Sequence, residues 1–129
     1  MTTTLRERVE AGAAWLDQVE PGWRDQISLA KLRMLDCERC ICGQVFALAA
    51  AQKSRPVDGY RFALELAGHK DPFSEEGPDW AYFHGFHALG PGEDDIEHEP
   101  EQRKWQRLAR EWRNFIREGA RREPHREYA

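Results

Sequence analysis

The chain has 129 residues, of which 40% are hydrophobic and 33% charged, and its net charge at pH 7 is −4. This length suits one domain, and five Trp, six Phe and three Tyr supply large apolar side chains that a disordered chain lacks. The sequence opens without a basic segment followed by an apolar one, and no apolar run approaches the ~20 residues of a membrane span. We therefore expect a cytoplasmic protein with no membrane partner.

The first predicted element is a helix over residues 5–19. Thr4 and Glu7 have the spacing of a capping box, and apolar residues then recur at helical intervals. Pro21 and Gly22 follow as a stop signal.

The middle of the chain predicts two further helices. Residues 27–35 follow neither a helical nor a strand period, so we expect a short helical turn or irregular chain there. The helical period returns over 40–53, and Asp36 is a candidate cap for its first turn. A third helix follows over 60–67 and ends at Gly68.

The next segments are shorter and more polar. We expect residues 69–78 to form a surface loop, because they carry two prolines and a glycine. The aromatic run over 79–86 predicts a short buried helix. Six acidic residues within 93–101 then predict a charged loop.

A long amphipathic helix is predicted from Glu101 onward, and residues 121–129 are expected to form a frayed tail. One of its faces is an apolar stripe of Trp105, Leu108, Trp112, Phe115 and Ile116. The opposite face is cationic, and we call it the arginine face: Arg103, Arg107, Arg110, Asn114, Arg117 and Arg121.

Charge is sorted along the chain. Residues 101–129 hold nine Lys/Arg against five Asp/Glu, a net +4, whereas residues 1–100 hold ten against eighteen, a net −8.

Like charges three and four residues apart on a helix repel, so the arginine face destabilises the helix unless something anionic meets it. The candidates are nucleic acid, an acidic protein surface and the chain's own loop over 93–101. Nucleic-acid binding usually requires a basic domain, and the sequence pI here is about 5.7. The alternative is an ordinary solvated face.

All three cysteines lie within six residues, and two of them suggest half of a zinc site. Cys37 and Cys40 have the spacing of a zinc knuckle, and His84 and His87 could complete a tetrahedron. The 43 residues between Cys40 and His84 exceed the usual finger spacing, and both histidines lie in an aromatic run that ordinary packing would also explain. The alternative is that the thiols pack as small hydrophobic groups. Substitute ligands would be Cys42, His69 and His98.

A Cys-x-x-Cys pair at a helix start also occurs in thiol redox proteins, which makes redox chemistry a second alternative. The strand that precedes such motifs is missing here. We find no phosphate-binding loop, nucleophile elbow or metalloprotease signature, so we expect no enzyme activity.

The order of several short motifs resembles a known family. Residues 14–17 (Ala-Trp-Leu-Asp), 21–27 (Pro-Gly-Trp-Arg-Asp-Gln-Ile) and 37–46, from Cys37 through Gly-Gln-Val-Phe, resemble small uncharacterised proteins encoded by actinobacterial phages and prophages. The resemblance implies phage genes acting inside a bacterial cell and assigns no activity. In that pattern the position of Cys42 is usually aliphatic, and paired histidines are absent. On this basis Gly43 and Gln44 indicate a close helix crossing, with the Gln44 amide bonded to neighbouring backbone.

Together these features predict a single all-α domain over 1–129. We expect an orthogonal bundle of four to five helices, with the helix over 40–53 at its centre and the apolar stripe of the last helix packed over it. The expected function is that of a non-catalytic phage accessory or regulatory protein. It would bind a host or phage macromolecule, above all a protein, through the arginine face and without a required cofactor. The alternatives are a zinc-stabilised nucleic-acid-binding module and a thiol redox protein.

Overall fold

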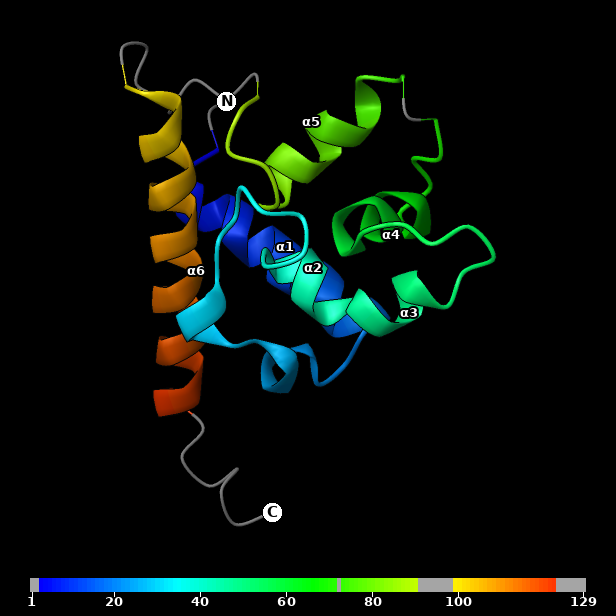
Figure 1. The fold of residues 1–129 in the computed structure, drawn as a ribbon. Helices are drawn as coiled ribbons and strands as arrows, with labels where there is room; N and C mark the ends of the chain where they lie inside the picture. The colour runs from blue at the N-terminus through cyan, green and yellow to red at the C-terminus, as the bar shows by residue number, and fades with distance from the viewer. Residues whose placement is uncertain (1–2, 72, 91–98, 123–129) are drawn as a thin grey trace.

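The structure, a computed structural model, describes residues 3–71, 73–90 and 99–122. Within these ranges it is helical and has no strand, which confirms the all-α prediction. Figure 1 shows α6 upright along one side of the molecule and α1 running obliquely behind α2. None of the described helices is long and apolar enough to cross a membrane. The elements are α1 (Leu5–Val19), the 3-10 turns η1 (Trp23–Gln26) and η2 (Leu29–Lys31), α2 (Ile41–Val45), α3 (Ala47–Ala51), α4 (Gly59–Leu66), α5 (Glu76–Phe83) and α6 (Glu101–Arg122).

The capping box predicted for α1 is confirmed. Glu7 N donates to Thr4 Oγ1 at 3.1 Å, and Thr4 N donates to Glu7 Oε1 at 2.9 Å. These two bonds pair amide groups that a helix N-terminus leaves without partners, and such a cap contributes about 1 kcal/mol. After α1 the chain turns at Gly22 (φ 86°). Trp23 is then buried, and its indole N–H donates to Asp17 at 2.8 Å.

The single helix predicted over 40–53 is divided into α2 and α3. Phe46 leaves helical geometry (φ −104°, ψ 10°) and is 2% exposed. Its ring packs against Trp15 and Phe62, at centroid distances of 6.0 and 5.3 Å. The break therefore lies where a large aromatic side chain is held in the core from two sides, and packing overrides the local helix preference of the alanines that follow.

The predicted cap of this segment is also corrected. Asp36 does not cap α2, because its carboxylate accepts a hydrogen bond from Glu38 N within the preceding turn. The cap is Cys40, whose Sγ accepts the Gly43 N–H at 3.2 Å. Sulfur is a weak acceptor, so residue type alone did not mark this position.

The close helix crossing predicted at Gly43 is confirmed. A Cβ on Gly59 at the start of α4 would lie 2.6 Å from Gly43 Cα, so only glycine fits. Beside the crossing, the Gln44 amide donates to the carbonyls of Ser28 and Arg39 and accepts from Ser28 N at 2.6 Å. Gln44 thereby connects α2 to Ser28, at the start of η2, and to Arg39 in the turn that precedes α2.

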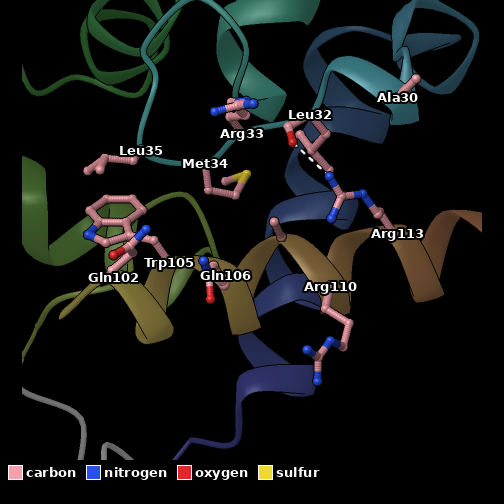
Figure 2. A pocket seen from close by; sticks show the side chains of 11 residues that line it. Ala30, Leu32, Arg33, Met34, Leu35, Gln102, Trp105, Gln106, Arg110 and Arg113 are labelled. Carbon is pink, nitrogen blue, oxygen red and sulfur yellow. Dashed lines mark hydrogen bonds between the residues drawn. The ribbon is translucent and has the colours of Figure 1, made fainter. Parts of the chain in front are cut away.

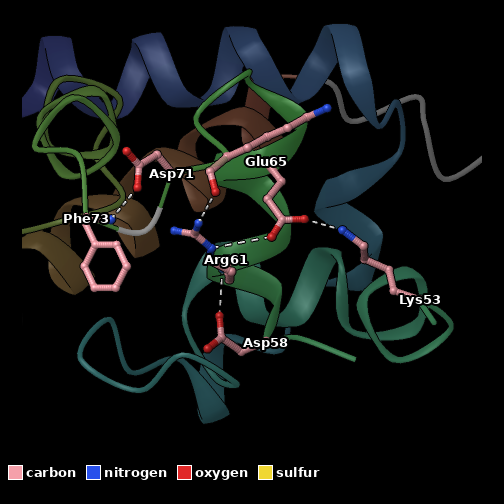
Figure 3. A network of polar contacts seen from close by, with 7 residues as sticks. Lys53, Asp58, Arg61, Glu65, Asp71 and Phe73 are labelled. Carbon is pink, nitrogen blue, oxygen red and sulfur yellow. Dashed lines mark hydrogen bonds and ion pairs between the residues drawn. The ribbon is translucent and has the colours of Figure 1, made fainter. Parts of the chain in front are cut away.

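Arg61 joins α4 to the segments around it (Figure 3). Asp58 caps α4 by accepting the Arg61 N–H at 2.7 Å, and the Arg61 guanidinium contacts Glu65 and donates to Lys70 O at 2.7 Å. Glu65 also pairs with Lys53, which follows α3.

The short helix predicted from residue 79 begins earlier than expected. α5 starts at Glu76, inside the region predicted as loop, and Ser74 Oγ accepts the Glu76 N–H at 3.1 Å. Pro78 is tolerated because it lies in the first turn, where its missing N–H costs no helical hydrogen bond. Gly77 and Pro78, which predicted a loop, thus lie in the first turn of α5.

The last helix begins at Glu101 as predicted, but its main helical partner is α1 and not the 40–53 segment. Trp112 is fully buried at this contact. Its ring meets Trp23 edge-on at 5.9 Å and stacks on Phe86 at 5.8 Å, and its Nε1–H donates to Gly85 O at 2.6 Å. Truncation of such a buried ring to alanine costs about 3–5 kcal/mol, so Trp112 anchors α6.

Candidate binding face on the last helix

The structure places most of the arginine face in solvent. Arg103, Arg110, Asn114 and Arg117 are exposed, and Arg107 is half-buried. The Arg121 side chain lies outside the described part of the structure. The face predicted from helical periodicity is therefore accessible along its described length.

One of these arginines has an internal partner. Arg107 Nε donates to Glu99 Oε1 at 3.0 Å, so an acid from the end of the predicted acidic loop neutralises part of the face. Residues 91–98 of that loop lie outside the described residues. Among the residues that are described, Arg103, Arg110 and Arg117 have neither an ion pair nor a side-chain hydrogen bond.

A groove lies beside this face, between residues 30–35 and α6 (Figure 2). Its volume is about 550 Å³. Arg113 connects the two walls, because its guanidinium donates to Leu32 O at 2.8 Å and to Leu29 O at 3.4 Å. Arg110 belongs to both the groove and the arginine face.

The groove was not predicted from the sequence. Arg33, Met34 and Leu35 come from a stretch without a clear period, and Arg113 lies between the two faces of α6 identified in the sequence. No local pattern indicates that residues 30–35 approach α6, because the contact joins segments about eighty residues apart, such as Leu32 and Arg113.

The cysteines have structural roles in the fold. Cys40 caps α2 and is 2% exposed, and burial raises the pKa of its thiol to about 12. Cys42 is fully buried, which raises its pKa well above the ordinary value. Cys37 is exposed, yet partial burial and the nearby Asp58, Asp36 and Glu38 also raise its pKa. Because the thiolate is the reactive form, three protonated thiols give no support to the redox alternative.

The two histidines predicted as zinc ligands pack against aromatic rings. His84 stacks on Trp80 at 4.3 Å, and its Nδ1 lies 2.8 Å from Trp80 O. His87 packs against Trp105 at 4.9 Å, and its Nδ1 accepts the Leu89 N–H at 3.1 Å. Burial lowers the pKa of His87, because the charged imidazolium is disfavoured away from water.

The proposed zinc ligands Cys37, Cys40, His84 and His87 are not gathered into one cluster. Among the described residues there is no group of three or more His, Cys, Asp or Glu side chains placed to hold a metal ion. Of the substitute ligands, Cys42 is fully buried, His69 lies 5.8 Å from the Trp80 ring, and His98 is outside the described ranges. Zinc binding remains a prediction of the sequence.

Comparison of the chain with protein-family models, curated proteins and solved structures found no match.

Proposed function

We propose that this protein is a non-catalytic binding protein that contacts a host or phage macromolecule in the cytoplasm of a bacterial cell, with the arginine face of α6 as its contact surface. The observation that carries the proposal is that Arg103, Arg110 and Arg117 are exposed on one helix face without a partner among the described residues. An anionic partner would relieve their mutual repulsion, and such complementary charges accelerate association and exclude wrong partners.

The phage setting is proposed from the resemblance of residues 14–46 to proteins of actinobacterial phages. The absence of catalysis is proposed from the chemistry of the described side chains. The exposed arginines are donors without an adjacent nucleophile, and the described thiols are held protonated.

Affinity capture from an actinobacterial lysate tests the proposal with two charge-matched variants. Arg110→Glu/Arg117→Glu reverses two charges on the arginine face, and Arg55→Glu/Lys70→Glu reverses two exposed charges elsewhere. We expect the first variant to lose the partner captured by the wild type and the second to retain it. Equal capture by both variants would refute the arginine face as the contact surface.

A further inference from the structure

We propose that the groove between residues 30–35 and α6 is a docking site for an acidic segment of a partner protein that carries at least one large apolar side chain. The inference rests on the proposed function and names the chemistry of its partner. It draws on the shape of the groove, its apolar floor and the sign of the charges around it.

The groove is long and open enough for a chain segment. Its α6 wall runs from Gln102 to Arg113, which corresponds to about 16 Å at 1.5 Å per residue. The side chains at its mouth, Arg33, Leu35 and Arg110, are exposed. An elongated, open depression suits a short peptide segment better than a small molecule, which binding sites usually enclose on most sides.

The floor of the groove is apolar. Met34, Trp105 and Ala109 line it and are 4%, 8% and 5% exposed, while Leu35 at the mouth is 63% exposed. Figure 2 shows Leu35 beside the Trp105 indole and Met34 directed toward α6. A single exposed leucine is ordinary on a protein surface, but here it extends an apolar floor into solvent. An apolar side chain of a partner could cover it and the floor together.

The rim is cationic. Arg33, Arg110 and Arg113 contribute to the lining, and none of the described residues that line the groove is acidic. Arg113 is engaged by two backbone carbonyls, whereas Arg33 and Arg110 have no ion pair or side-chain hydrogen bond within the described ranges. In Figure 2 Arg33 belongs to the wall of residues 30–35 and Arg110 to the α6 wall, with the Arg110 guanidinium directed away from residues 30–35. The chain as a whole has a net charge of −4, so the positive charge at the groove is a local feature of this surface.

These features favour an acidic peptide over nucleic acid. Proteins that bind single strands usually offer exposed aromatic faces for base stacking, but only 8% of Trp105 is exposed. The chain is acidic overall, with a sequence pI of about 5.7, whereas nucleic-acid-binding domains are typically basic. An acidic peptide with one large apolar residue would place carboxylates near Arg33 and Arg110 and its apolar side chain against the floor of the groove.

The test is selection of a random 12-residue peptide library against the immobilised full chain. The variants Arg33→Glu and Leu35→Ser change exposed groove residues, and Arg55→Glu and Leu48→Ser are matched controls at exposed positions outside the groove lining. We expect enriched peptides to combine Asp/Glu with a large apolar residue. Both groove variants should weaken their binding about tenfold, which corresponds to about 1.4 kcal/mol. The controls should bind like the wild type.

Other outcomes overturn the inference. These are no enrichment, enrichment of basic or purely polar peptides, or equal weakening by controls and groove variants. A single-stranded DNA probe that binds more tightly than any selected peptide, and loses affinity in Arg33→Glu, would assign the groove to nucleic acid instead. If lysate capture is lost in Arg110→Glu/Arg117→Glu but survives in Leu35→Ser and Arg33→Glu, the docking groove fails while the proposed function stands.

Discussion

The two flanks of α6 use their polar groups differently. On the flank toward α1, Arg6 pairs with Glu111 and Glu118, and the Trp112 N–H is bonded to Gly85 O. On the groove flank, Arg110 has no such partner, and the buried Trp105 Nε1 has no hydrogen-bond partner among the described residues. Nearly all buried polar groups in proteins are paired. The polar groups named on the first flank stabilise the fold, whereas on the second flank the exposed Arg110 is available to another molecule.

The packed flank should be the more sensitive to added volume. A Cβ on Gly12 of α1 would lie 2.0 Å from His84 O and 3.1 Å from the Trp112 ring, and the backbone oxygen cannot move aside cheaply. We expect Gly12→Ala to lower the free energy of unfolding by about 3 kcal/mol, the upper end of the usual cost of overpacking a core. Urea unfolding followed by circular dichroism measures this effect.

Gly77→Ala is the control, because its Cβ would make only ordinary contacts, the nearest at 3.5 Å. It should stay within about 1 kcal/mol of the wild type, because the helix preference of alanine is opposed by the restriction that Pro78 places on the residue before it. If Gly12→Ala loses as little stability as Gly77→Ala, the α1–α6 contact is looser than the structure indicates.

The two tryptophans of the stripe provide a matched pair. Trp112→Phe removes the donor to Gly85 O and leaves a buried carbonyl without its partner, whereas Trp105→Phe removes an N–H that has none in the described structure. Both changes remove the same ring volume. Trp112→Phe should therefore be the more destabilising by about 1–3 kcal/mol in urea unfolding. Equal losses would contradict the contrast between the flanks.

Removing single charges should have smaller effects. Arg6→Ala breaks ion pairs with Glu111 and Glu118 that are partly shielded from solvent, and it should cost up to about 1 kcal/mol. Arg110→Ala should stay within about 0.5 kcal/mol of the wild type, because Arg110 is exposed and has no described partner. Thermal unfolding of the two variants at low and high salt distinguishes them. A larger loss in Arg110→Ala would assign Arg110 a structural role.

The smallest expected effect is a pH dependence from His87. Burial lowers its pKa below the ordinary 6.5, despite the nearby Glu101, which acts in the opposite direction. The unfolded chain then binds the proton more readily than the fold, so stability is full above about pH 6.5 and declines as the pH falls below it. His87→Gln cannot titrate. The stability advantage of the wild type over this variant should shrink between pH 7.5 and 5.5, and a pH-independent difference would refute the role of His87.

The sequence alone determined the features that depend on near neighbours. The Thr4–Glu7 cap, the start of α6 at Glu101 and the exposed arginine face all follow from residues three to four positions apart, and a helix brings such residues together by its own geometry. The Gln44 bonds were predicted in kind, although their partners, Ser28 and Arg39, were not.

Only the tertiary structure decided where the helices meet. Tertiary packing determines three features: the break at Phe46, the sulfur cap at Cys40 and the packing of α6 on α1. Each depends on which side chains from distant parts of the chain pack against the segment. The groove arises in the same way, because Arg113 reaches Leu32 across 81 positions. A helical period shows which face of α6 is apolar and which is cationic, but it does not show what lies beside either one. That depends on the approach of distant segments, which is governed by the packing of the whole core.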